Sequence, residues 1–284
     1  MTRVAIVTDS TAYIPKDYLD QYNISVVPQV LIWGDQTYED GVNIQPDEFY
    51  QQLKNARVMP TTSQASIINM QNTFTKLLEQ GYDVLGVFLS AKLSGTLQSA
   101  AQGREALASG KDKVEIMDSY TTAMAMGFQV LAAARAAADG ASSAECKAVV
   151  NAASTNSGVY FVVDTLEFLH RGGRIGGAAR LLGTALNLKP ILSIQDGKVE
   201  AMERIRTKGK ALERLLEIVA EKTAGKSQVR LASLHANAAV EGKEVLDRAV
   251  KLINPVESIF TSVSPVVGTH TGPGTIGLAY MTGI

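Results

Sequence analysis

Short apolar runs alternate with helical patterns through the first half of this 284-residue chain, and this alternation restricts the folds that it can adopt. Three runs bounded by turn residues are typical of buried parallel strands, at residues 4–7, 84–89 and 114–117. Helices are expected between Ile67 and Leu78, at about 96–109 with a stop at Gly110, at 121–139 with a stop at Gly140, and after a capping box at Ser142 and Glu145. Strands and helices in this order predict an α/β fold with a doubly wound, mainly parallel sheet.

The pattern changes after about residue 157. Two apolar stretches flank Asp196-Gly197, a pair that favours a tight hairpin turn. Around it we expect strands at 158–164, 191–194, 199–205 and 229–234, helices at 209–223 and 240–253, and further strands after Pro255. A central hairpin predicts a mixed or antiparallel sheet with covering helices. The length favours two α/β domains, at 1–157 and 158–284. The first would include a hairpin-like excursion at about 26–59, with a helix at about 46–55.

Charge and composition exclude several classes of function. The formal net charge is −1 and the cations are scattered, so nothing indicates a partner such as nucleic acid or an anionic membrane. A single cysteine, Cys146, excludes an internal disulfide, and the sequence lacks the Cys/His spacing of a metal site. The first residues become polar too soon for a signal peptide, and no apolar stretch approaches the roughly 20 residues of a membrane span. We therefore expect a cytoplasmic protein without an integral membrane segment.

Three clusters of hydroxyl residues and glycines, far apart in the chain, are the main candidates for a ligand site. They occupy residues 60–66, 93–96 and 268–274. The last two follow apolar, strand-like runs at 84–89 and 262–267, and loops after strands are where open α/β sheets bind ligands. Short hydroxyl side chains and glycine amides are uncharged hydrogen-bond donors. We therefore expect the clusters to form one polar pocket.

Six short motifs occur in order along the chain: Thr8-Asp9-Ser10, Pro60-Thr61-Thr62-Ser63-Gln64, Leu93-Ser94-Gly95-Thr96, Asp118-Ser119, Arg171-Gly172-Gly173-Arg174-Ile175 and His270-Thr271-Gly272-Pro273-Gly274. Together they resemble the DegV family over the whole chain. The resemblance implies two α/β domains with a long-chain fatty acid buried in a tunnel between them. It also implies a non-catalytic carrier subunit of bacterial fatty acid kinase. A separate ATP-dependent kinase subunit would form the acyl-phosphate for phospholipid synthesis.

The same resemblance implies which residues hold the ligand. The threonine and serine that bind the carboxyl group in the family match Thr62 and Ser94. Further ligand-binding candidates in the matching motifs are His270, Thr271, Ser63, Gly95 and Ser119. Two positions depart from the family pattern. Ala65 stands where proline is usual, and His170 stands where lysine is frequent, in a region that we associate with partner docking.

A fatty acid suits such a pocket for physical reasons. Burial contributes about 0.8 kcal/mol for each methylene group. A buried carboxylate is unfavourable unless several charge-assisted hydrogen bonds, of about 1.5–3 kcal/mol each, offset the loss of water. We expect these donors to be uncharged, which would leave the carboxylate oxygen reactive toward a phosphoryl group. The protein would then need no cofactor and no catalytic residue of its own.

The glycine-rich segment 171–177 has three interpretations. Its amides and guanidinium groups could cradle a phosphate, or the segment could be a solvated turn. We favour a third use, in which Arg171, Arg174 and Arg204 form a positive rim where the kinase docks.

Two enzymes are rival interpretations. A serine hydrolase acting on a lipid or acyl ester would use Ser94 as nucleophile and His270 as base, because triads are recognised by geometry. Asp9 or Asp118 would orient the histidine. Against this, the serine lacks the Gly-x-Ser-x-Gly elbow of α/β-hydrolases. A nucleotide-binding kinase is disfavoured because the chain lacks a Gly-x-x-x-x-Gly-Lys-Ser/Thr loop. The polar pocket also argues against a purely structural scaffold.

Overall fold

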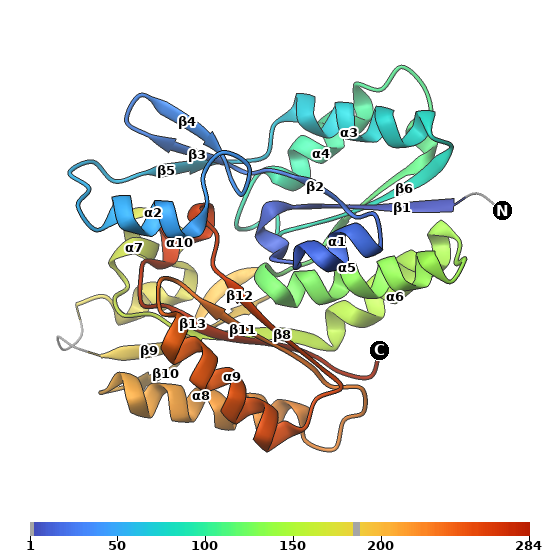
Figure 1. Ribbon diagram of the computed structural model, residues 1–284. Helices are drawn as coiled ribbons and strands as arrows, with labels where there is room; N and C mark the ends of the chain where they lie inside the picture. The colour runs from blue at the N-terminus through green and yellow to red at the C-terminus, as the bar shows by residue number, and fades with distance from the viewer. Residues whose placement is uncertain (1–2, 184–187) are drawn as a thin grey trace.

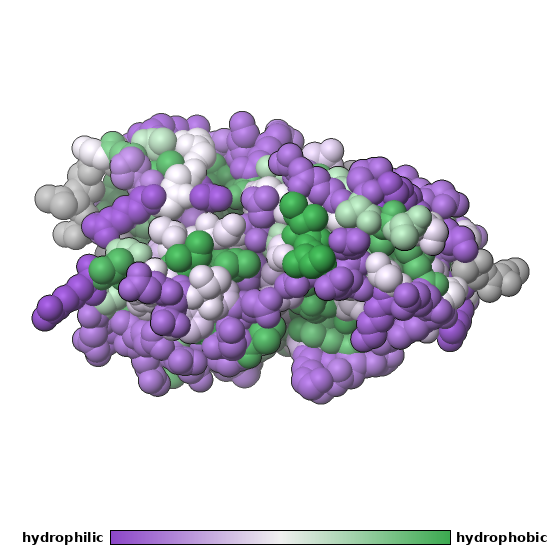
Figure 2. Space-filling view, turned by 90° about the horizontal axis from the view of Figure 1, so that it is seen from above, coloured by the Kyte–Doolittle hydropathy of each residue, from purple (hydrophilic) through white to green (hydrophobic). Residues whose placement is uncertain are grey.

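The structure is a computed structural model that describes residues 3–183 and 188–284. Its strands form sheets of four, six and three strands, with helices on their faces (Figure 1). This arrangement confirms the predicted mixed α/β fold class. The face seen in Figure 2 is largely hydrophilic, with hydrophobic residues in small groups. No helix in the described part of the chain has the length and apolarity to cross a membrane.

The four-stranded sheet is parallel throughout, as the alternating pattern predicts. Its strand order is β2-β1-β6-β7. The strands are β1 (Arg3–Asp9), β2 (Ser25–Val27), β6 (Tyr82–Phe88) and β7 (Val114–Asp118). Most of β1 and β6 is buried on both faces, which explains why their sequences are continuous apolar runs. The helices of this half are α1 (Lys16–Gln21), α3 (Ile67–Glu79), α4 (Thr96–Glu105), α5 (Ala123–Ala138) and α6 (Ser143–Thr155), and α6 begins with the predicted capping box.

The six-stranded sheet is mixed, with the order β10-β9-β8-β13-β11-β12, and only its β11–β12 pair is parallel. The strands are β8 (Ser157–Val162), β9 (Lys189–Gln195), β10 (Lys198–Ile205), β11 (Arg230–His235), β12 (Glu257–Ser262) and β13 (Ile276–Met281). Asp196 and Gly197 join β9 to β10 with φ angles of 47° and 78°, the positive values that a two-residue hairpin turn requires. Helices α8 (Lys208–Thr223) and α9 (Ala239–Ile253) cover the face turned away from the parallel sheet (Figure 1).

A small antiparallel sheet, in the order β4-β3-β5, lies beside these two. Strands β3 (Val30–Trp33) and β4 (Gln36–Glu39) form a hairpin, and α2 (Pro46–Leu53) follows. The third strand, β5 (Thr61–Ser63), was not predicted, because three hydroxyl residues carry no apolar signal. Its pairing places Thr62 opposite Leu31 and so fixes the first hydroxyl cluster in position.

The segment before the third cluster is not the strand that its apolar residues indicate. Strand β12 ends at Ser262, and helix α10 (Pro265–Thr271) then begins. The φ angle of proline is fixed near the helical value. Proline also lacks a backbone N–H, but the N–H groups of the first helical turn have no partner within the helix. Pro265 therefore favours the start of a helix. The predicted strand-like run at 262–267 is therefore wrong, and His270 lies on a helix. Shorter helical turns are η1 (Ser10–Ala12), η2 (Lys111–Lys113), α7 (Glu167–Arg171) and η3 (Gly176–Leu181).

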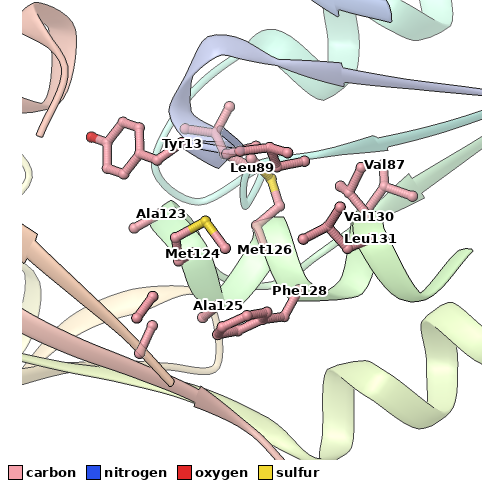
Figure 3. Packing of buried hydrophobic residues seen from close by; sticks show 14 of the residues in the cluster. Tyr13, Val87, Leu89, Ala123, Met124, Ala125, Met126, Phe128, Val130 and Leu131 are labelled. Atoms are coloured by element: carbon pink, nitrogen blue, oxygen red, sulfur yellow. The ribbon is translucent and has the colours of Figure 1, made fainter. Parts of the chain in front are cut away.

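Helix α5 lies between the two large sheets and packs on both of them (Figure 1). Every residue from Ala123 to Ala134 is buried, and a helix that is apolar on all sides is typical of a protein interior. Met126 and Phe128 leave the helix on different sides (Figure 3). One hydrophobic cluster includes residues of α5 and of both sheets. The sheets thus share a core across this helix.

Gly127→Ala should lower the free energy of unfolding. A Cβ at position 127 would lie 2.4 Å from the carbonyl oxygen of Ala12, and overpacking of this kind costs about 1–3 kcal/mol. The matched control is Gly209→Ala in α8, where nothing lies within 4 Å of the added Cβ. That change should be neutral or stabilising by up to about 1 kcal/mol. Urea denaturation measures both, and equal stabilities would contradict the close packing of α5 against η1.

Candidate functional site

An apolar cavity of about 110 Å³ lies at the N-terminal end of α5. Leu89, Tyr13 and Ala123, which line it, lie near this end of the helix in Figure 3. Its walls come from the six-stranded sheet, from β5, from α10 and from the loop that follows β6 of the parallel sheet. The aliphatic and aromatic hydrocarbon residues in these walls are Leu89, Leu93, Ala123, Val159, Phe161, Leu169, Ile194, Val199, Leu234, Val263, Val266 and Val267. The cavity therefore depends on segments that are distant in the sequence.

Four polar residues from separate segments line the same cavity: Thr62, Ser94, Arg174 and His270. Thr62 Oγ1 lies 2.7 Å from His270 Nε2, and this contact joins β5 to α10. Arg174 Nε donates to the carbonyl oxygen of Leu93 at 3.1 Å, and Leu93 is the residue immediately before Ser94. The structure thus brings one residue from each of the three clusters into a polar group at the wall of a single cavity.

The loop that carries Ser94 is fixed by the hairpin of the other sheet. Ser90 Oγ donates to the carbonyl oxygen of Gly197 at 3.0 Å. Lys92 Nζ donates to the carbonyl oxygen of Asp196 at 2.7 Å. Both acceptors belong to the turn between β9 and β10. The tight turn therefore positions Ser94 as well as reversing the chain.

His270 is a neutral side chain at neutral pH. Burial, and to a lesser extent the neighbouring Arg174 guanidinium, lower the pKa of its imidazole to about 4. Gly172 allows the ring to lie this close to the chain, because a Cβ at that position would lie 2.0 Å from His270 Nδ1. Within the described residues, Nδ1 is buried without a hydrogen-bond partner. The imidazole can therefore form its hydrogen bond with Thr62 while it carries no positive charge.

Arg174 corrects the expectation of an entirely uncharged cap. Its Nη1 donates to the carbonyl oxygen of Gly172 at 2.8 Å, and together with the Nε bond to Leu93 this holds the half-buried guanidinium at the cavity wall. No carboxylate pairs with it among the residues that the structure describes. Guanidinium binds carboxylate and phosphate well because its N–H groups form a planar fork. The sequence analysis placed Arg174 on a docking rim, whereas its side chain lines the cavity.

The remaining residues of the clusters differ in their positions. Ser63 lines the cavity and is exposed. Thr271 also lines it, but its hydroxyl donates to the carbonyl oxygen of Val267 at 3.2 Å, within its own helix. Gly95 has a different function, because a Cβ there would lie 2.4 Å from Gln64 Oε1. Its missing side chain lets the first two clusters approach each other.

Ser119 does not join this group. It lines a separate polar cavity of about 480 Å³, together with Tyr120 and Gln129. Its hydroxyl is buried and donates to the carbonyl oxygen of Thr121 at 3.1 Å, inside the turn between β7 and α5. Thr122 and Ala123, which follow Thr121, line the apolar cavity. The chain therefore passes from one cavity to the other at the start of α5, and Ser119 does not share a cavity with Ser94.

Two arginines of the predicted rim are exposed. Arg171 forms an ion pair with Glu167 one helical turn before it, and Arg204 lies on β10, at the edge of the six-stranded sheet. These positions leave both guanidinium groups accessible to another molecule.

Both candidate aspartates for a hydrolase stabilise backbone turns instead of orienting His270. Asp9 accepts hydrogen bonds from the backbone nitrogens of Thr11, at 3.0 Å, and Leu89, at 2.9 Å. Asp118 accepts from the backbone nitrogens of Ala91 and Tyr120. In the described parts of the chain, Ser94 pairs with Thr96 while His270 pairs with Thr62, so no serine–histidine hydrogen bond is formed.

Sequence reasoning missed several lining residues. Gln29 is almost fully buried and lines the cavity, as do Thr11 and Tyr13. The only available signal was the Thr8-Asp9-Ser10 motif, which precedes Thr11. Gln29 lies between β2 and β3, where nothing in the local sequence distinguishes it from an ordinary loop residue.

The fold and the cavity define a class of two-sheet α/β proteins with an internal apolar site closed by polar groups. A family model described as an uncharacterised protein of the DegV family matches residues 3–283. A DegV domain-containing protein of Streptomyces coelicolor is 38% identical over 278 residues, which are 97% of this chain and 97% of that protein. The chain therefore belongs to the DegV family.

Two solved structures are similar to this one over their whole length. A DegV family protein of Thermus thermophilus, described as binding fatty acid, is 33% identical, with a TM-score of 0.90 over 99% of each chain. DegV of Bacillus subtilis, described as a fatty acid binding protein, is 32% identical, with a TM-score of 0.90 over 100% of each chain.

Arg174→Gln should raise the pKa of His270 from about 4 toward its ordinary value, because a positive neighbour is removed while the burial remains. An NMR titration of the imidazole in delipidated protein measures this shift. In the unfolded chain the pKa of His270 is near 6.5. Between about pH 4 and 6.5 the unfolded state therefore binds more protons at this residue than the folded state does. The stability that His270 contributes is therefore complete above this range and falls as the pH decreases through it. An unchanged or lowered pKa in the variant would contradict the proximity of the two groups.

Proposed function

We propose that this protein binds a long-chain fatty acid in the apolar cavity and presents its carboxyl group to a separate ATP-dependent kinase. The observation that carries the proposal is the group formed by Thr62, Ser94, Arg174 and His270 in a cavity whose other lining residues are mostly apolar. The fatty acids bound by the relatives from Thermus thermophilus and Bacillus subtilis support it.

The cavity combines apolar walls with a polar group, as a fatty acid combines an apolar tail with a carboxyl group. A tail of about fifteen methylene groups provides an upper limit of about 12 kcal/mol before the cost of ordering. The carboxylate needs compensation for its lost water, which Thr62, Ser94 and Arg174 supply as hydrogen-bond donors. A neutral His270 keeps the number of positive charges at one. The acyl-phosphate product is also an anion, so the same groups suit it.

The protein would act as a carrier rather than as an enzyme. Ser94 and His270 have separate hydrogen-bond partners, which argues against the hydrolase alternative. The exposed Ser63 at the cavity wall provides a side from which a cytoplasmic kinase could approach the carboxyl group. Arg171 and Arg204 would form its docking rim. The fatty acid would lie between the units 1–157 and 158–284.

Ser94→Ala should weaken fatty acid binding by about 10- to 100-fold, because one charge-assisted hydrogen bond of about 1.5–3 kcal/mol is lost. The matched control is Thr61→Ala, an exposed hydroxyl in the same small sheet as Thr62 that should leave binding unchanged. Displacement of a fluorescent fatty acid measures both, and native mass spectrometry of purified protein identifies the co-purified acid. Equal affinities of the two variants would refute the role of Ser94.

Arg171→Glu and Arg204→Glu should each weaken kinase binding and leave fatty acid affinity unchanged. Each replaces an exposed positive charge with a negative one at the proposed rim. Arg248→Glu is the control, because Arg248 is also exposed and paired with a glutamate, Glu213, but belongs to α9 on the far side of the six-stranded sheet. Surface plasmon resonance with the kinase subunit measures the effect. Retained kinase binding in both rim variants would exclude this surface, and loss of fatty acid binding as well would indicate misfolding.

A further inference from the structure

Ser94 and Thr96 form a hydrogen-bonded pair whose direction follows from the contacts around Thr96. Their hydroxyl oxygens lie 3.0 Å apart. Thr96 is fully buried at the start of α4, whereas Ser94 is one of the described residues that line the cavity. A hydroxyl has one proton and two lone pairs, so the other partners of Thr96 decide which of the two groups is the donor.

Two N–H groups already donate to Thr96 Oγ1. The Gln29 amide nitrogen lies 2.8 Å from it, and the backbone nitrogen of Ala65 lies 3.3 Å from it. The Thr96 hydroxyl itself donates to the Gln29 amide oxygen at 3.0 Å, and either orientation of the amide would place one N–H beside Thr96. Both lone pairs of Thr96 are therefore occupied. Its hydroxyl cannot also accept the proton of Ser94.

Ser94 consequently keeps its own proton for another acceptor. Its oxygen accepts from the backbone nitrogen of Thr96 at 3.3 Å and lies within reach of the Thr96 hydroxyl. Within residues 3–183 and 188–284, no other acceptor is hydrogen-bonded to it. The unused O–H group belongs to a side chain at the cavity wall, beside the loop that Arg174 holds.

We propose that Thr96 is a positioning residue that fixes Ser94 as a hydrogen-bond donor toward the carboxylate of a bound fatty acid. This inference rests on the proposed function. Gln29 and Ala65 occupy the lone pairs of Thr96. The Thr96 hydroxyl therefore cannot accept the Ser94 proton, which stays directed toward the cavity. The site therefore selects an anionic head group partly through Thr96 and Ala65, which lie outside its lining.

A double-mutant cycle with Thr96→Val and Ser94→Ala tests the inference, with palmitate labelled with carbon-13 at its carboxyl carbon as the ligand. Thr96→Val removes the hydroxyl that donates to the Gln29 amide oxygen, so that oxygen can accept the Ser94 proton. Palmitate binding should therefore weaken by about 10-fold, and the carboxyl resonance should shift toward its position in Ser94→Ala. In the Ser94→Ala background the same change should add less than about twofold, because Thr96 acts through Ser94. Thr96→Ser keeps the hydroxyl and should bind palmitate within about twofold of the unaltered protein.

Gln29→Met provides a second route if Thr96→Val does not fold. It frees one lone pair on Thr96, which can then accept the Ser94 proton, so palmitate binding should again fall only when Ser94 is present. Additive losses in either cycle, with an unmoved carboxyl resonance, would overturn the role of Thr96 and leave the proposed function intact. Absence of saturable palmitate binding by the unaltered protein would instead refute the proposed function, and the inference with it.

Discussion

Burial of one helix between two sheets is the constraint on which the rest of this structure depends. Residues 123–134 of α5 are enclosed on every side, so neither sheet completes its core without the other. At the far end of the helix, Arg135 pairs with Glu257 of β12, and Arg230 of β11 reaches the same carboxylate at 3.0 Å. Apolar packing and this half-buried ion pair together fix the sheets relative to each other.

The cavity follows from this arrangement. At the start of α5, apolar residues of the six-stranded sheet line one cavity with Leu89 and Leu93 of the loop after β6, and Thr122 and Ala123 belong to the cavity wall. The polar end is assembled by contacts across the same junction, from β5 to α10 and from the β9–β10 turn to the Ser94 loop. A change in the relative position of the sheets would therefore separate the hydroxyl groups from the apolar walls.

Sequence motifs identified the residues at the site better than they identified their roles. Thr62, Ser94 and His270 line one cavity, although Thr62 lies on a strand and His270 on a helix and not on the loops that the clusters predicted. Arg174 was assigned to the surface, since an arginine between glycines has the same pattern in a turn and in a cavity wall. Ser119 lines a different cavity, because the few residues between β7 and α5 lead the chain from one cavity to the other.

Local patterns in the sequence determined most helices, most strands and the hairpin at Asp196-Gly197, because propensity, periodicity and turn chemistry act over a few residues. The prediction that the polar clusters converge rested on loops at one edge of a sheet, whereas Thr62 lies on β5 of the small sheet and His270 on α10. Only the tertiary structure decided that β5 joins a third sheet, that Pro265 begins a helix and that Gln29 lines the cavity. These features depend on contacts between residues far apart in the chain, whose free energy has no counterpart in the local sequence.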